Sequence, residues 1–216
     1  MKRLFFGATV FTLSFLAFIN LSSDIIRKVQ WTLDNKLLTF FYTHRTPVLT
    51  TVMKSISMFG FEIPIVLGVA IFIVALIRKY RKEAFVFALV VGMAPVIDGI
   101  LKRVIQRPRP PFFPLVSAGS YSFPSGHALT SFVFYATLTY FIYYFTKNKR
   151  LTAISAICFS LLILLIGISR IYLGVHYPTD VLTGWLIGLC WLSGVFLVIY
   201  RHGRRSRIGE GNKIFR

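Results

Sequence analysis

The sequence predicts an all-α integral membrane protein, a bundle of six transmembrane helices with a short interfacial helix in the first outer loop. Hydrophobic residues make up 56% of the 216-residue chain, and the mean hydropathy is +0.70. Soluble globular domains are nearer 45–50% apolar by roughly the same count. The apolar residues also come in six runs, most of them close to the roughly 20 residues that cross a bilayer, with basic residues gathered between the runs.

The N-terminal run continues apolar from Met1, with its basic start, through about Leu21. We expect an uncleaved first transmembrane helix here rather than a cleaved signal peptide. The apolar region is long for a signal peptide, and no clear cleavage site of small residues precedes Asp24.

Residues 24–60 are mixed in polarity and precede the second span. Within them, Trp31 to Tyr42 favours a short helix lying at the membrane interface, and an ordinary connecting helix fits the same residues. The five remaining spans are expected at about 61–77, 83–101, 127–145, 151–169 and 181–200.

The basic residues predict the topology. The N-terminus, the turns at 78–82 and 147–150 and the C-terminal segment 201–216 together hold most of the 25 Lys and Arg residues. Six spans place all four segments on one side, which the positive-inside rule identifies as the cytoplasm. We therefore expect a multi-pass cell-membrane domain over residues 1–200 and a basic cytoplasmic tail over 201–216. Because the basic residues lie at the ends of apolar runs, the net charge of +18 does not indicate a nucleic-acid partner.

This topology brings three polar motifs to the outer face. The first contains Lys102 and Arg109 at the end of the third span, where the prolines within 108–111 prevent a regular helix. Both cations can then face one pocket, and both are suited to phosphate. For Arg103 and Arg107 we favour contact with headgroups or the membrane interface over a direct part in catalysis. Asp98, four residues before Lys102, predicts an ion pair that positions this lysine.

The second motif opens the fourth span with the sequence Pro-Ser-Gly-His at 124–127. Ser125 is a good helix N-cap, and Gly126 allows close approach of the backbone. The free N–H groups of a helix start attract an anion, and His127 would lie close to it in the first turn.

The third motif places Arg170 at the end of the fifth span, followed by His176 and Asp180. A spacing of four puts the last two side chains on one helical face. The carboxylate can then accept a hydrogen bond from the His176 Nδ1–H, fix its tautomer and leave Nε2 free to attack.

Cofactors and metals are not expected. Cys158 and Cys190 lie inside apolar runs without the spacing of a zinc site, and we interpret them as small buried apolar side chains. The outer-face carboxylates are too few for a two-metal site.

Together, K-x6-R-P, P-S-G-H and S-R-x5-H-x3-D resemble the three signature motifs of the type 2 phosphatidic acid phosphatase (PAP2) superfamily. The match covers about residues 102–180, and the chain is similar to small bacterial membrane members. The resemblance implies that His176 is a nucleophile forming a phosphohistidine, that Asp180 orients it and that His127 is the general acid. It also implies a phosphate clamp formed by Lys102, Arg109, Arg170, Ser125 and Gly126, with no metal required.

The resemblance further implies hydrolysis of a lipid phosphate or diphosphate at the outer membrane face. Undecaprenyl diphosphate, phosphatidylglycerol phosphate and phosphatidic acid are the candidate substrates, since the motifs concern only the phosphate. A lipid phosphotransferase using the same intermediate, a phosphatase for soluble phosphates and a non-enzymatic lipid-binding or transport protein remain alternatives. The sequence does not determine an oligomeric state.

Overall fold

The computed structural model describes residues 2–29, 31–111, 113–119 and 121–211, with the side chains of residues 3 and 200–211 left out. Within these ranges the chain forms eight helices and no strand. The helices are α1 (Lys2–Ile26), α2 (Thr32–Thr43), α3 (Pro47–Met58), α4 (Glu62–Ile77), α5 (Arg81–Ile105), α6 (Gly126–Thr146), α7 (Lys149–Tyr172) and α8 (Pro178–Gly211). Six stretches of the described chain are long and apolar enough to cross a membrane. The predicted all-α fold with six spans is confirmed.

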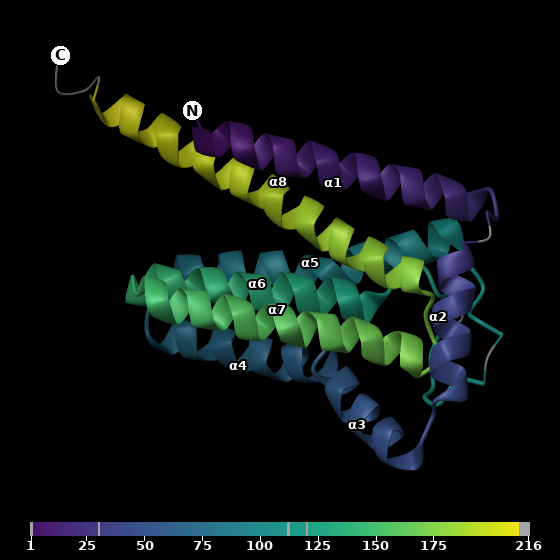
Figure 1. Cartoon of the computed structure of the whole chain (residues 1–216). Coiled ribbons are helices and arrows are strands. Elements are labelled where there is room, and N and C mark those ends of the chain that lie inside the picture. Colours follow the sequence, from purple (N-terminus) through teal and green to yellow (C-terminus); the bar gives the residue numbers. More distant parts are fainter. Residues whose placement is uncertain (1, 30, 112, 120, 212–216) are drawn as a thin grey trace.

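Helices α4 to α7 form one bundle, and α1 packs along α8 to form a second arm (Figure 1). The two arms meet where α8 begins, because the first part of α8 packs on α6. From there α8 diverges from the bundle toward the C-terminus. Helix α2 lies across the end of the molecule at which α8 starts, as expected for a short helix in the loop between the first two spans (Figure 1).

Helix α3 was not predicted from the sequence, which placed the start of the second span near residue 61. The side chain of Thr46 caps this helix by accepting from the Leu49 N–H, and a proline occupies its first turn. Together α3 and α4 form one apolar stretch of 31 residues, Pro47–Ile77, broken between Met58 and Glu62. The polar residues of α3 concealed its helical character in the sequence.

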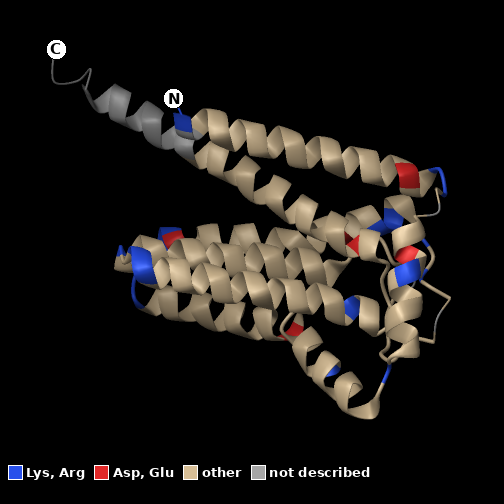
Figure 2. Ribbon diagram, viewed as in Figure 1, with Lys and Arg blue, Asp and Glu red and all other residues tan. Residues whose placement is uncertain are grey.

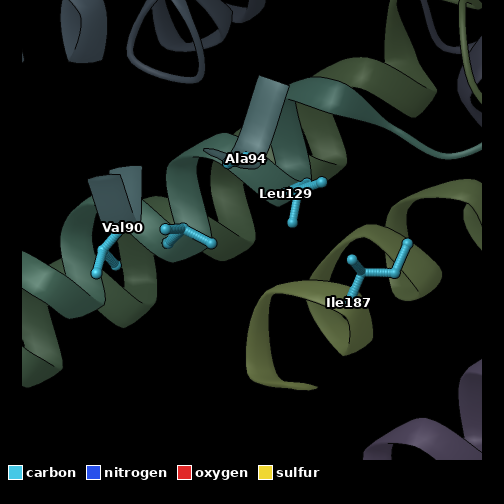
Figure 3. Close-up of a cluster of buried hydrophobic side chains, with 5 residues drawn as sticks. Val90, Ala94, Leu129 and Ile187 are labelled. Carbon is cyan, nitrogen blue, oxygen red and sulfur yellow. The ribbon is translucent and has the colours of Figure 1, made fainter. Parts of the chain in front are cut away.

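Helix α6, which begins with the second motif, is the most enclosed of the spans. Leu129 and Val133 pack with Val90 and Ala94 of α5 and Ile187 of α8 in one buried cluster (Figure 3). Elsewhere, many large apolar side chains on the other spans are exposed, as expected for helices that face lipid. The buried cluster therefore fixes the relative positions of α5, α6 and α8, which carry Lys102, His127 and Asp180.

Charged residues gather at the two ends of the helices (Figure 2). At one end lie the basic turns that connect α4 to α5 and α6 to α7. At the other end, beside α2, acidic and basic residues are mixed. This second end contains the C-terminal ends of α5 and α7 and the start of α6 and α8, so it carries all three motifs.

Candidate active site

The structure brings the predicted catalytic and phosphate-binding side chains together at the end of the molecule beside helix α2, here called the α2 end. The ring of His127 lies close to His176 and close enough to Arg170, Lys102 and Arg109 to experience their charges. Arg170 and Arg109 also act electrostatically on His176. The three motifs, separated by up to 74 positions in the sequence, thus form one cluster of two histidines and three cations.

His176 is buried, with 2% of its surface exposed, in the loop between α7 and α8. Its Nδ1 lies 2.7 Å from the carbonyl oxygen of Ser122. A carbonyl oxygen can only accept, so Nδ1 carries the hydrogen and Nε2 keeps its lone pair. Burial lowers the pKa of His176 to about 4, against an ordinary value of 6.5. The imidazole is therefore neutral at pH 7, as a nucleophile requires.

Asp180 is fully buried one turn away from His176 on α8. Its Oδ2 lies 3.6 Å from the His176 Nδ1, which is longer than a hydrogen bond, and accepts instead from the Tyr177 N–H at 2.9 Å. Its Oδ1 accepts from Arg107 at 2.6 Å. The sequence predicted the carboxylate as the acceptor for Nδ1. The structure places the Ser122 carbonyl there, with Asp180 as a neighbouring negative charge.

The start of α6 brings the second motif into the same cluster. The Ser125 hydroxyl accepts from the Ala128 N–H at 3.4 Å, as an N-cap does, and the Ser125 N–H donates to the Asp180 carbonyl at 3.0 Å. At Gly126, an added Cβ would lie 2.7 Å from a carboxylate oxygen of Asp98. Glycine is thus required for the approach of Asp98, a close contact different from the anion contact that the sequence suggested.

His127 follows on the first turn of α6. Its ring stacks on Phe61, with the ring centroids 5.6 Å apart, and its Nε2 lies 3.9 Å from a carboxylate oxygen of Glu62. Phe61 lies in the break between α3 and α4, and Glu62 is the first residue of α4. The end of α3–α4 that faces the site therefore lies directly against the predicted general acid.

Each of the three predicted clamp cations is held by its own neighbours. Lys102 pairs with Asp98 at 2.6 Å, which confirms the predicted ion pair. Arg109 donates to the carbonyls of Gly119 and Val175, and burial lowers its pKa from the ordinary value of 12.5. An arginine remains charged at neutral pH after such a shift.

Arg170 is buried, and its Nη1 donates to the Ser57 hydroxyl of α3 at 2.7 Å. Its Nε is buried and has no hydrogen-bond partner among the described side chains and backbone. Buried polar groups are nearly always satisfied in folded proteins, so an unpaired donor at this place fits a site for an anion.

Metal ligands do not gather in the part of the chain that the structure describes. No group of three or more His, Cys, Asp and Glu side chains there could hold a metal ion. Positive charge in the cluster comes from lysine and arginine side chains.

Besides Ser122, four residues of this region were missed or misinterpreted in the sequence. Arg107 was expected to contact headgroups, but it binds Asp180 and Asp34 inside the protein, and that expectation was wrong. Asp34, Ser57 and Glu62 belong to segments without a motif. The one available signal was an acidic residue, Asp34, on an otherwise apolar helix face.

Comparisons with known proteins identify the family of the chain. The family model of the PAP2 superfamily matches residues 83–204. Phosphatidylglycerophosphatase B of Bacillus subtilis (strain 168) is 34% identical over 186 residues, which cover 81% of this chain and 87% of that protein. An undecaprenyl-diphosphatase of Sulfolobus acidocaldarius is 30% identical over 171 residues, covering 75% of this chain and 76% of the other.

The fold comparison gives the same result. A crystal structure of a transmembrane PAP2-type phosphatidylglycerolphosphate phosphatase from Bacillus subtilis superimposes with a TM-score of 0.78 at 30% identity. The match covers 86% of this chain and 94% of that one. By its motifs, its fold and these relatives, the chain belongs to the PAP2 superfamily.

Proposed function

We propose that this protein is a membrane lipid phosphatase that hydrolyses a lipid phosphate or diphosphate through a phosphohistidine on His176. The observation that supports this most directly is the state of His176. It is buried and neutral, its Nδ1 donates to a carbonyl, and Arg109 and Arg170 act on it electrostatically. A neutral imidazole with a free Nε2 among cations is suited to attack on a phosphorus atom.

In the first step the Nε2 lone pair of His176 forms a bond to phosphorus while the bond from phosphorus to the leaving oxygen breaks. His127 donates a proton to that oxygen, so that the lipid leaves as a neutral alcohol or as a shorter phosphate. Lys102, Arg109 and Arg170 stabilise the charge that develops on the phosphoryl oxygens, with the Ser125 hydroxyl and the Gly126 N–H as further donors.

In the second step His127, now neutral, takes a proton from water, and the water oxygen attacks the phosphorus. The bond between phosphorus and Nε2 breaks, His176 recovers its lone pair, and inorganic phosphate leaves. Asp180, next to His176, stabilises the positive charge that the imidazole carries while it is phosphorylated. The reaction as proposed uses no metal and no cofactor.

Phosphatidylglycerol phosphate is the first candidate substrate, because the relative that this chain matches over 87% of its length is named a phosphatidylglycerophosphatase. Undecaprenyl diphosphate is the second, because another relative is named an undecaprenyl-diphosphatase. Phosphatidic acid is the third. A site at the end of a membrane-spanning bundle can receive such lipids by lateral diffusion in the bilayer.

We place this site on the extracytoplasmic side of the cell membrane, with both termini in the cytoplasm. The support is the positive-inside rule applied to the basic turns at the opposite end (Figure 2). Residues 1–200 would form the phosphatase domain and 201–216 a basic cytoplasmic tail. Helix α8 continues into this tail as far as Gly211, and residues 212–216 lie outside the described residues.

The test is phosphate release by the detergent-purified protein in EDTA, with the three lipids offered in parallel. His176→Ala is the inactive variant, and His44→Ala is its matched control, because His44 is exposed in the loop after α2. We expect release that persists in EDTA, disappears in His176→Ala and is unchanged in His44→Ala.

Trapping of a phosphorylated protein by acid quench, absent in His176→Ala, would support the intermediate. Activity that survives in His176→Ala would contradict it. Loss of lipid phosphate without free phosphate would identify a phosphotransferase instead, and no reaction with any lipid would favour a binding protein.

A further inference from the structure

Arg107 lies at the centre of a buried polar cluster behind the proposed nucleophile. Its Nη1 donates to Asp180 Oδ1 at 2.6 Å, and its Nη2 donates to Asp34 Oδ2 at 3.0 Å. The guanidinium carbon lies 3.8 Å from the centroid of the Tyr177 ring. The side chain of Arg107 is 14% exposed, and those of Asp34 and Asp180 are 4% and 0% exposed. One cation therefore joins two carboxylates that would be costly to bury without it.

The backbone of Arg107 contacts the other partner of the nucleophile. Its carbonyl oxygen accepts from the Ser122 N–H at 2.9 Å, and the Ser122 carbonyl accepts from His176 Nδ1 at 2.7 Å. Both groups that face Nδ1 are thus attached to Arg107. The Ser122 carbonyl is held through the main chain of Arg107, and the Asp180 carboxylate is held through its side chain.

Asp34 connects this cluster to helix α2. Its Oδ1 accepts from the Thr179 N–H at 2.9 Å, and its Oδ2 accepts from the Thr179 hydroxyl at 2.7 Å. It thereby satisfies a free N–H group in the first turn of α8, as an N-cap would. One turn later on α2, Leu38 is buried against residues of α6, α7 and α8. Helix α2 is therefore attached by a charged and an apolar contact to the helix that carries Asp180.

We infer that Arg107 and Asp34 are positioning residues for the nucleophile. Their contacts fix the orientation of the Asp180 carboxylate and the start of α8, and thereby the direction of His176 Nε2. This inference rests on the proposed function, in which His176 attacks the phosphate. It assigns a part in the arrangement of the site to helix α2, which the sequence predicted only as an interfacial or connecting helix.

The cluster is separate from the proposed phosphate clamp. Asp34 and Arg107 line a cavity of about 680 Å³ between the α1–α2 connection and the end of α5. Among the described residues that line it, none is Lys102, Arg109 or Arg170. Both Nη atoms of Arg107 already have carboxylate partners. Loss of the Arg107 side chain should therefore impair the attack and leave lipid binding intact.

The test compares kcat and KM for phosphate release by the full-length protein, with the lipid that the wild type hydrolyses fastest. The variants are Arg107→Ala, Arg107→Lys and the isosteric Asp34→Asn. The matched controls are Asn35→Ala and Lys36→Ala, because both residues are exposed neighbours of Asp34 on α2 and Lys36→Ala also removes a positive charge. Each protein is also checked by gel filtration and by its melting temperature in detergent.

We expect kcat of Arg107→Ala to fall about 100-fold with KM unchanged, since a misplacement of the attacking atom by about 1 Å can lower the rate by that factor. Arg107→Lys and Asp34→Asn should keep intermediate kcat values. A lysine supplies the charge but cannot contact two carboxylates in the same way, and an asparagine keeps the shape without the charge. The two controls should match the wild type.

Three results would overturn the inference. These are wild-type kcat in Arg107→Ala and Asp34→Asn, a rise in KM at constant kcat, and a loss of activity that only follows the loss of folded protein. If Arg107→Ala does not fold, Arg107→Lys and Asp34→Asn decide by the same criteria. An inactive His176→Ala beside a fully active Arg107→Ala refutes the positioning role alone. An active His176→Ala refutes the proposed function and this inference with it.

Discussion

The surroundings of His176 distinguish its two ring nitrogens. Nδ1 faces a backbone carbonyl at 2.7 Å and a carboxylate at 3.6 Å, so a hydrogen is held on this side. A backbone carbonyl cannot take up a proton at ordinary pH, so it fixes the tautomer without titrating. The nearby negative charge of Asp180 can then act where it is needed, on the phosphorylated and cationic imidazole.

The pKa of His176 predicts the acid side of the pH profile. Burial lowers this pKa to about 4. The Asp180 carboxylate raises it in part, and the positive charges of Arg170 and Arg109 lower it further. Below this pKa, Nε2 takes up a proton and loses the lone pair that attacks phosphorus. We expect the rate of phosphoprotein formation to fall only as the pH approaches about 4. Rapid-quench measurements with an aryl phosphate would test this, because its leaving group needs little help from His127. A fall near 6.5, the ordinary value for histidine, would contradict the prediction.

The pair of Asp98 and Lys102 gives a second prediction at the scale of residues. Asp98→Asn removes the ionic partner of Lys102, which lies 2.6 Å away, and frees the lysine from its present position. A hydrogen bond between charged groups contributes about 1.5–3 kcal/mol, which corresponds to roughly 10- to 100-fold in kcat/KM. Steady-state kinetics would show this decrease, and Glu83→Gln at the opposite end of α5 is the control. Unchanged activity in Asp98→Asn would show that Lys102 does not depend on this partner.

At the scale of elements, the break between α3 and α4 shapes the site. Phe61 in the break and Glu62 at the start of α4 lie next to His127, and α3 supplies Ser57 next to Arg170. A continuous helix through residues 59–61 would follow another path and could not offer these contacts. A discontinuous membrane helix is tolerated where its irregular backbone is buried in protein.

Gly60 in this break provides the test of that role. A Cβ at Gly60 would lie 2.8 Å from the Ile166 side chain and 2.9 Å from the ring of His127. Gly60→Ala should therefore displace His127 or the break itself and lower kcat. Gly92→Ala on α5 is the control and should keep the wild-type kcat, because an added Cβ there meets open space. Overpacking of this kind costs about 1–3 kcal/mol, so a lower melting temperature should accompany the effect. Wild-type kcat and melting temperature in Gly60→Ala would show that the break can adapt.

At the scale of the whole molecule, charge is divided between the two ends of the bundle. The end with the basic turns has the composition of a cytoplasmic face, and the α2 end combines acidic and basic residues (Figure 2). Cations at the α2 end are involved in buried contacts with carboxylates and carbonyls. Their number therefore reflects the site rather than the topology.

Cysteine labelling in intact cells would test the orientation. In a chain with Cys158 and Cys190 replaced by serine, Ala118→Cys in the exposed loop before α6 should react with a membrane-impermeant maleimide. Lys79→Cys, in the exposed turn between α4 and α5, should react only after the cells are opened. The reverse pattern would place the site in the cytoplasm. Both positions lie outside the helices, so helix packing should be little affected.

Local properties of the sequence determined which segments span the membrane and which motif residues come together at one face. An apolar run of sufficient length must cross the hydrocarbon as a helix, because its backbone groups have no other partners there. Alternating spans then bring the ends that carry Lys102, His127, Arg170 and His176 to one face, whatever the details of packing. This is why the six spans and the convergence of the three motifs could be predicted.

Only the tertiary structure decided which atoms meet within that face. Arg107 contacts Asp180 across 73 positions of sequence, and Asp34 contacts Thr179 across 145. Such contacts depend on the rotation of each helix about its axis and on the path of the connection between α5 and α6. Neither property follows from hydrophobic runs or from motif spacing, because both result from the packing of all the helices together. The acceptor for His176 Nδ1 and the role of helix α2 were therefore visible only in the folded molecule.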